Sequence, residues 1–356
     1  MNLLSKPIDK RSQRKNEHVQ HALNQSLQSA PSDFDGVYFI HQSLPSFNLD
    51  DVNLSTDLGP FRLELPLYIN AMTGGSEWTR SINGKLAAVA EATGIPMAVG
   101  SMHAAIKQPE LSDSFTIARE NNPNGLLFAN VGADVSMEGA KKAVDLLKAD
   151  ALQIHINAPQ ELIMPEGDRN FKTWRDNIQQ IAEKIDMPVI IKEVGFGMSK
   201  ETLQILKNIG IKYADISGKG GTNFATIENS RRKNQEMSYM DNWGISTVTS
   251  LLETKPFQQD MHILASGGVR TPLDAMKCLA LGARAVGMSK MMLEQVEHSG
   301  VEAAIEFVDQ FHHQMKKIAI ITNAKNIEEL RNRPIVLSPE LISWQQQRSM
   351  EQQGRF

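Results

Sequence analysis

Short apolar segments alternate with longer amphipathic segments along most of the chain after Pro66. The apolar segments are bounded by Gly, Pro or Asn and lie at 67–72, 96–100, 126–131, 151–156, 188–194, 213–218, 262–268 and 285–289. Between them, a helical period predicts helices over 77–93, 136–148, 171–185, 199–209, 241–253 and 272–281. Parallel strands that are buried on both faces have this continuous apolar character and need a crossover helix between them.

Eight such strand and helix units are what a (β/α)8 TIM barrel requires. The competing architecture is a doubly wound sheet, but its Gly-rich turn G-x-G-x-x-G is not matched by "AMTGGSEW" after the first strand. The sequence therefore predicts an α/β protein with a barrel over 61–325, an N-terminal extension over 1–60 and a C-terminal tail over 326–356. The connection 219–240 is long for this fold and indicates a functional or disordered loop.

Composition and charge exclude several classes of protein. The 356 residues carry a net charge of -4, which gives no overall basic field for nucleic acid or for an anionic membrane. The single cysteine, Cys278, excludes a disulfide framework or a cysteine metal cluster. No apolar run approaches the roughly 18 residues of a membrane span, and the N-terminus lacks a signal-peptide pattern. We expect a cytoplasmic protein with a small-molecule ligand.

Polar or glycine residues end nearly every predicted strand. In a TIM barrel these carboxyl ends share one face, which is where active sites lie. Each residue alone is better explained as a buried polar group with a partner. Together they predict one site, formed by Asn70, Thr73, Ser101, His103, Asn130, Lys192, Glu193, Ser217, Ser266, Gly267, Gly268 and Gly287.

Glycines after the last strands favour a phosphate site. "ASGG" ends the seventh strand, Gly287 ends the eighth, and "SGKGGTN" follows the sixth. Barrels often hold phosphate on exposed amides at this position, although turn glycines are the alternative. Lys192 would sit buried at a strand end and needs an anionic partner, which is either a carboxylate or a phosphorylated cofactor such as a flavin.

The segment "QIHINAPQE" places His155, Asn157, Gln160 and Glu161 at the end of the fourth strand. One carboxylate with amides suits Mg²⁺ that is completed by substrate phosphate oxygens. The alternative is that Gln160 and Glu161 only cap the following helix. Likewise "RKNEH", which begins at Arg14, is either a solvated arm or a phosphate clamp folded over the site.

These segments together resemble the FMN-dependent type 2 isopentenyl-diphosphate isomerases. The resemblance covers most of the chain, through "RKNEH", "INAMTGG", "VGSMHAA", "FANVGAD", "QIHINAPQE", "VIIKEVGFGMS", "ADISGKGGTNFATIENSR" and "ASGGVRTPLDAMKCLALGARAVGMS". It implies an isomerase of isoprenoid biosynthesis that interconverts isopentenyl and dimethylallyl diphosphate, with reduced FMN as acid and base. It also implies Mg²⁺ on the diphosphate, NADPH as reductant, and a homo-oligomer that is a tetramer or larger.

The resemblance also implies residue roles. Gln160 and His155 are the expected catalytic residues, and Glu161 is the expected Mg²⁺ ligand. His155 is expected to hydrogen bond the diphosphate; the alternative is that it only supports a neighbouring site residue. The expected substrate contacts are Arg14, Lys15, Ser101, Met102, His103, Asn157 and Gln160. The expected FMN contacts are Ala71, Met72, Thr73, Ser101, Asn130, Lys192, Ser217, Thr222, Ser266, Gly267, Gly268, Gly287 and Met288.

Two other functions compete with the isomerase. FMN-dependent hydroxyacid oxidases or dehydrogenases resemble the last two strands, but they carry a base histidine in an Asn-His-Gly-Gly-Arg motif after the sixth strand. Here that segment is Gly218-Lys219-Gly220-Gly221-Thr222, without a histidine. A non-catalytic flavin or phosphate sensor is the second alternative, but it leaves Glu161 and the basic arm unexplained.

Overall fold

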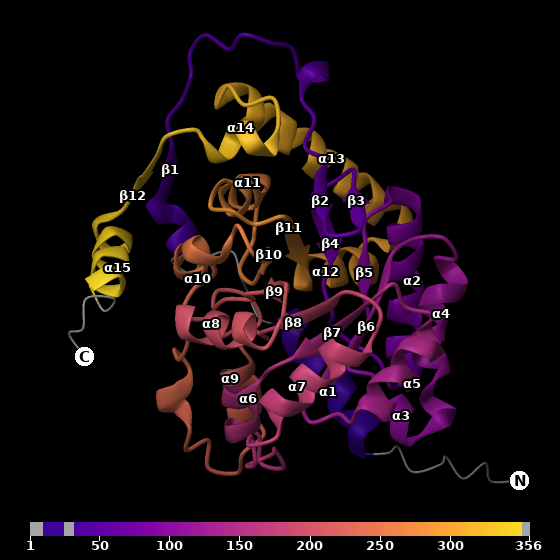
Figure 1. Cartoon of the computed structure of the whole chain (residues 1–356). Coiled ribbons are helices and arrows are strands. Elements are labelled where there is room, and N and C mark those ends of the chain that lie inside the picture. Colours follow the sequence, from indigo (N-terminus) through magenta and orange to yellow (C-terminus); the bar gives the residue numbers. More distant parts are fainter. Residues whose placement is uncertain (1–9, 25–31, 351–356) are drawn as a thin grey trace, which may run out of the picture.

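Eight parallel strands form a closed barrel in this computed structural model, which describes residues 10–24 and 32–350 (Figure 1). The strands follow one another around the barrel in sequence order, and the last pairs with the first. They are β4 (Leu67–Ile69), β5 (Met97–Ala98), β6 (Leu127–Gly132), β7 (Ala151–His155), β8 (Val189–Lys192), β9 (Tyr213–Asp215), β10 (His262–Ser266) and β11 (Ala285–Met288). The barrel prediction and all eight strands are confirmed.

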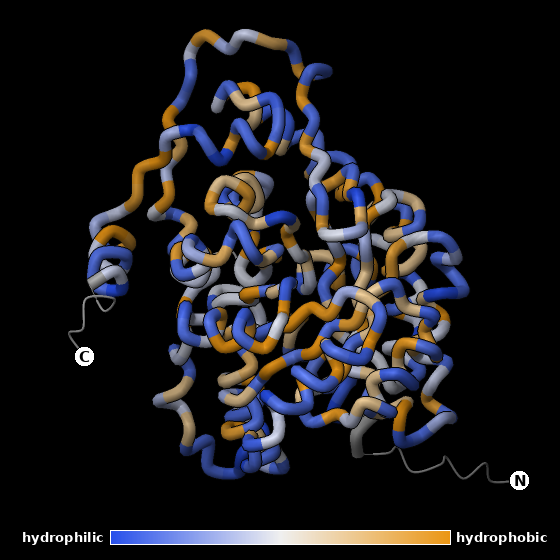
Figure 2. Tube along the Cα trace, viewed as in Figure 1, coloured by the Kyte–Doolittle hydropathy of each residue, from blue (hydrophilic) through white to orange (hydrophobic). Residues whose placement is uncertain are grey.

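Helices at the predicted positions surround the barrel. Several begin at a hydroxyl residue that accepts a hydrogen bond from the backbone N–H three residues later, as Ser76 does from Thr79 and Ser199 from Thr202. Figure 2 shows hydrophobic residues along the central strands and mixed character on the outer helices, as expected for helices that bury one face. These helices are α2 (Glu77–Thr93), α5 (Met137–Leu147), α7 (Trp174–Lys184), α8 (Lys200–Asn208), α10 (Thr247–Thr254) and α11 (Pro272–Ala280).

Further helices lie in the connections and after the barrel. The connection 219–240 is not irregular, because it contains α9 and the 3-10 turn η4. Several of these helices have only five to seven residues, too few to show a period in the sequence. They are α3 (His103–Lys107), η3 (Pro109–Leu111), α4 (Asp113–Asn121), α6 (Ala158–Ile163), α9 (Phe224–Ser230), η4 (Ser238–Met240), η5 (Lys255–Phe257), α12 (Lys290–His298) and α13 (Gly300–Ile321).

The two terminal segments join each other outside the barrel. The N-terminal extension contains short strands that its sequence does not predict, and β1 pairs antiparallel with β12 of the tail. Pairing over such distance in sequence leaves no periodic pattern, which explains why these strands are missed. The elements are α1 (Lys10–Asn24), η1 (Asp33–Gly36), β1 (Val37–Phe39), η2 (Leu49–Asp51), β2 (Thr56–Leu58), β3 (Phe61–Leu63), α14 (Ile327–Arg331), β12 (Ile335–Leu337) and α15 (Pro339–Met350).

Side chains inside the barrel change character along its axis. At the amino ends of the strands, Tyr68, Phe128 and Leu264 form an apolar cluster with Leu58 and Leu63 from the β2–β3 hairpin. Two residues further along each strand the side chains point inward again, because side chains alternate along a strand. The buried residues at this level are polar: Asn70, Asn130, Gln153, Lys192, Asp215 and Ser266.

Across residues 10–24 and 32–350, the chain contains no helix that is both long and apolar enough to span a bilayer.

Candidate active site

A cavity of about 960 Å³ opens at the carboxyl ends of the barrel strands. Its wall combines strand ends with α1, α6 and α9, which lie together at one end of the molecule (Figure 1). The segment "RKNEH" lies within α1, and Arg14, Lys15 and His18 line the cavity. The basic arm is therefore folded over the site rather than solvated.

Most of the residues predicted for the site line this one cavity. Strands β6, β7, β8 and β11 contribute their last residues, whereas β4, β5, β9 and β10 contribute through residues just beyond their ends. The lining residues among those predicted are Arg14, Lys15, Ala71, Met72, Ser101, His103, Asn130, His155, Asn157, Gln160, Glu161, Lys192, Ser217, Thr222, Gly267, Gly268, Gly287 and Met288. The structure thus gathers residues that are far apart in sequence.

Five predicted residues do not line the cavity: Asn70, Thr73, Met102, Glu193 and Ser266. Met102 is fully buried, and Ser266 donates its hydroxyl hydrogen to Asp215 inside the barrel. Thr73 is also buried, and its Oγ1 has no hydrogen-bond partner among the described residues. Their side chains support the wall from the packed interior instead of forming it.

Glycine backbones form a cradle where β9 and β10 end. Gly268 has a φ of 71°, and a Cβ added there would lie 2.8 Å from the carbonyl carbon of Gly220. A side chain at this position would also cover the exposed backbone, so the close approach of the two loops requires glycine. Exposed amides in such a cradle fit a phosphate group, as the sequence predicts.

Lys192 lies buried at the end of β8, and its ammonium donates to the backbone carbonyl of Glu193 at 2.8 Å. The Glu193 carboxylate is not its ion-pair partner, because it accepts from the backbone N–H groups of Val194, Gly195 and Phe196. Burial lowers the pKa of Lys192, while the nearby charges of Asp215 and Glu193 oppose that effect. A cation so poorly paired suits an anionic group in the cavity.

The α1 side of the cavity is cationic. Lys15 has its pKa lowered to about 8 by burial and by the neighbouring Arg14. A value of about 8 keeps this ammonium mostly charged at neutral pH. Arg14 lies 3.5 Å from Glu166, which is half exposed. These charges fit an anionic ligand with more than one negative group.

Glu228 on α9 is a buried residue that the sequence reasoning missed. Its carboxylate accepts from Gln160 Nε2 at 2.9 Å and from Arg231 at 2.6 Å, and it lies 3.0 Å from His18 Nε2. Burial raises the pKa of this carboxyl, but these partners outweigh burial and lower the pKa to about 2. The motif "ATIENSR" contains it, yet nothing in that pattern marks the glutamate as buried.

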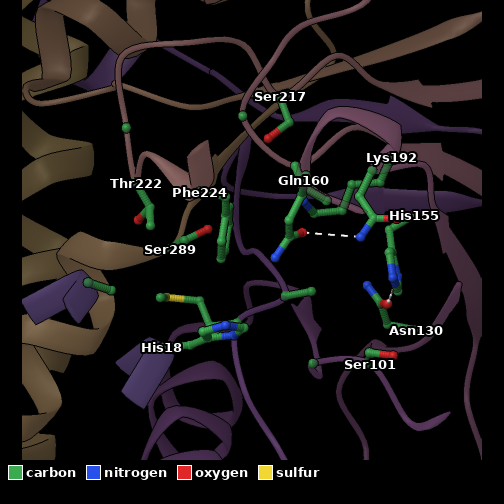
Figure 3. A pocket seen from close by; sticks show the side chains of 18 of the residues that line it. His18, Ser101, Asn130, His155, Gln160, Lys192, Ser217, Thr222, Phe224 and Ser289 are labelled. Atoms are coloured by element: carbon green, nitrogen blue, oxygen red, sulfur yellow. Dashed lines mark hydrogen bonds between the residues drawn. The ribbon is translucent and has the colours of Figure 1, made fainter. Parts of the chain in front are cut away.

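Gln160 is held at both ends of its amide. Besides donating to Glu228, it accepts from Asn157 Nδ2 at 3.1 Å, which Figure 3 shows as a dashed line. Asn157 also donates to Glu161 at 2.9 Å, and the second carboxylate oxygen of Glu161 accepts from the N–H of Asp168. Asn157, Gln160 and Glu161 of the segment "QIHINAPQE" therefore form one connected group.

No cluster of three or more His, Cys, Asp or Glu side chains suited to a metal occurs in the part of the chain that the structure describes. A divalent ion at Glu161 would need ligand oxygens from a bound phosphate, as Mg²⁺ sites commonly do. Glu161 lines the cavity, so such oxygens can reach it. The donor set fits a Mg²⁺ carried by a phosphorylated ligand.

His155 lies on the cavity wall beside Asn130 (Figure 3), with its Nδ1 at 2.8 Å from Asn130 Oδ1. Burial, and then the charges of Lys15 and Lys192, lower its pKa to about 3. The imidazole is therefore neutral at physiological pH.

The residue that replaces the oxidase histidine lies outside the cavity wall. The ammonium of Lys219 donates to the backbone carbonyl of Asn242 at 3.1 Å, in the connection that follows α9. The position that supplies the base in hydroxyacid oxidases thus contributes no side chain to this cavity.

Comparison with known sequences and structures defines the class of protein. The chain matches the family described as FMN-dependent dehydrogenase over residues 136–337. Flavocytochrome b2 with benzoylformate has a similar fold, with a TM-score of 0.67 at 17% identity over 90% of this chain and 82% of that one. A mandelate oxidase gives a TM-score of 0.63 at 16% identity over 90% and 92%. The fold and the match define an FMN-dependent barrel protein.

Closer relatives define the family within that class. An isopentenyl-diphosphate delta-isomerase of Staphylococcus saprophyticus is 56% identical over 96% of this chain and 99% of its own length. The protein of the same name from Staphylococcus epidermidis is 57% identical over 96% and 97%. The chain belongs to the isopentenyl-diphosphate delta-isomerase family.

Proposed function

We propose that this protein interconverts isopentenyl diphosphate and dimethylallyl diphosphate, with reduced FMN and Mg²⁺. The observation that carries the proposal is the composition of the cavity. It combines a glycine cradle, a cationic side and the carboxylate of Glu161, while Lys219, at the position of the oxidase base, donates to a backbone carbonyl outside the cavity wall. Family membership supports the same reaction.

FMN fits the part of the cavity formed by β8 to β11. The cradle at Gly267 and Gly268 would hold its phosphate, and Lys192 would lie near its ring. When bound in its reduced form, FMN supplies an electron-rich ring and an exchangeable proton to the hydrocarbon. The FMN-dependent family match supports this cofactor.

The substrate diphosphate would lie between α1 and α6. Arg14 and Lys15 supply positive charge there, and Glu161 would hold a Mg²⁺ that neutralises part of the diphosphate charge. This arrangement anchors the charged end of the substrate and leaves the hydrocarbon end toward the barrel axis. Ser101, His103 and Asn157 line the space between these groups.

Gln160 lies where the hydrocarbon end would reach. Its amide does not ionise in the working range, so it positions the alkene or assists a proton transfer rather than acting as a strong base. The carboxylate of Glu228 fixes it, and Phe224 contributes an apolar surface beside it (Figure 3). Excluding water here protects the cation-like state that double-bond migration passes through.

Resemblance to the family supports three further features of the proposal: NADPH as the reductant, a homo-oligomer of four or more chains, and a cytoplasmic location.

The test uses FMN-loaded enzyme reduced under anaerobic conditions with Mg²⁺ and isopentenyl diphosphate in deuterated water. Formation of dimethylallyl diphosphate with solvent deuterium in the product, while the flavin spectrum stays that of the reduced form, is the expected result. Oxidation of lactate or glycolate by the oxidised protein, without isomerisation, would overturn the proposal and establish a hydroxyacid oxidase.

A further inference from the structure

A line of buried amide side chains crosses the barrel interior from Asp215 to His155. Asn70 Nδ2 donates to Asp215 at 2.8 Å, and Gln153 Nε2 donates to Asn70 Oδ1 at 3.5 Å. Asn130 Nδ2 then donates to Gln153 Oε1 at 3.1 Å, and Asn130 Oδ1 lies 2.8 Å from His155 Nδ1. The line joins β9, β4, β7 and β6 beneath the cavity.

The direction of this line is fixed at the Asp215 end. A carboxylate only accepts hydrogen bonds, so Asn70 must present its NH2 group to Asp215. The backbone N–H of Ala71 donates to Asn70 Oδ1 at 2.8 Å, which fixes the other end of the same amide independently. Tyr68 and Ser266 donate to Asp215 as well, at 2.7 and 2.8 Å.

The direction then propagates through the next two amides. Asn70 Oδ1 accepts, so Gln153 turns its NH2 toward it and its oxygen toward Asn130. Asn130 therefore turns its NH2 toward Gln153 and its oxygen toward His155. An oxygen 2.8 Å from Nδ1 requires that this ring nitrogen carry the hydrogen. Gln153 and Asn130 are both buried, so water does not compete for these groups.

We propose that Asp215, Asn70, Gln153 and Asn130 are positioning residues that hold His155 as the Nδ1–H tautomer. The Nε2 atom is then an unprotonated hydrogen-bond acceptor for the cavity that His155 lines. The ring is neutral at physiological pH, as its lowered pKa indicates, so Nε2 gains no second proton. None of the four residues needs to touch the substrate for this effect.

The tautomer changes the role expected for His155. An Nε2 lone pair cannot donate to a diphosphate oxygen and would repel it. It accepts instead from an N–H or O–H group, so the diphosphate must be held by other donors, among them Arg14 and Lys15 on α1. This consequence for the substrate rests on the proposed function, whereas the tautomer itself is a property of the chain.

Nitrogen-15 NMR of the FMN-loaded protein with labelled histidine tests the tautomer directly. The chain has nine histidines, and the His155 signals are identified by their loss in His155→Asn. We expect a protonated Nδ1 and an unprotonated Nε2 at neutral pH. A protonated Nε2, or a doubly protonated ring, would overturn the proposal whether or not the protein proves to be an isomerase.

Variants of the amide line test the cause. Gln153→Leu frees Asn130 to turn its NH2 toward His155, so an Nε2–H signal should appear. Asn130→Asp offers only oxygens to Nδ1, so it should keep the Nδ1–H form and should restore that form when combined with Gln153→Leu. The matched control Gln258→Leu changes a half-buried glutamine that bonds Thr254 far from the site, and it should leave the signals unchanged.

Two results would contradict the proposal that the line of amides sets the tautomer. One is an unchanged tautomer in folded Gln153→Leu, and the other is a double variant that behaves like Gln153→Leu alone. If Gln153→Leu does not fold, Asn130→Asp alone still decides, because loss of its Nδ1–H signal would refute the assignment. Isomerase assays run separately, so a protein with the expected tautomer but no isomerase activity would refute only the proposed function.

Discussion

Glu228→Gln removes one buried negative charge while keeping the size of the side chain. In the native protein this carboxylate accepts from Gln160 and Arg231 and lies 3.0 Å from His18 Nε2. Burial alone would raise the pKa of the carboxyl, but these partners outweigh it and bring the pKa to about 2. The ordinary value is 4.5, so the charged form is strongly favoured in the folded state.

The size of the effect follows from that difference. The pKa of the Glu228 carboxyl falls from its ordinary value of 4.5 to about 2 in the folded protein. This difference corresponds to a contribution of about 3 kcal/mol to the free energy of unfolding. Because the pKa is lower in the folded state, this contribution is fully present above pH 4.5, and it is lost as the pH falls toward 2. Glu228→Gln should therefore be less stable than the wild type by about 3 kcal/mol at neutral pH, with a gap that narrows in acid.

Denaturant unfolding from neutral pH down to about pH 3 measures this gap. Glu236→Gln is the control, because Glu236 forms an exposed ion pair with Arg232 and should follow the wild type. A gap that stays constant across the pH range would show that the amide destabilises by packing alone. The absence of a gap at neutral pH would refute the linkage reasoning altogether.

Three further predictions concern the ligands. Gly268→Ala should weaken FMN binding by about tenfold or more, because φ there is 71° and the cradle has no room for a Cβ; unchanged affinity in a fluorescence titration would contradict the cradle. Glu161→Gln should raise the Mg²⁺ concentration needed for half-maximal turnover by roughly tenfold while the flavin spectrum is retained; loss of FMN would contradict the metal role. Lys192→Met should lower the reduction potential of bound FMN by on the order of 30 mV, measured spectroelectrochemically, and a raised potential would argue against a cation at the ring.

Barrel strands were predictable because each one is buried on both faces and reads as a continuous apolar run. Strands β1 and β12 were not, because three residues each gain their hydrogen bonds only from a partner at the other end of the chain. Local pattern contains no information about such a partner.

Some residues of the candidate site could likewise be predicted from the sequence, and others could not. Strand ends such as Lys192 and Gly268 could be assigned because the fold fixes which end carries the site. Glu228 could not, since its burial depends on α9 folding back over α6 and on α1 covering both. Met102 was assigned to the substrate by its neighbours in sequence, but the turn after β5 directs it into the core. Tertiary packing decides these cases.

The apolar layer at the amino end of the barrel also bears on the kinetics of ligand exchange. Leu58 and Leu63 of the β2–β3 hairpin pack with Tyr68 and Phe128 and close that end of the barrel. Under the proposed function, FMN and the substrate would then share one mouth, the one that α1 borders. A bound substrate would therefore slow the escape of the cofactor, and FMN release should be faster from the substrate-free enzyme.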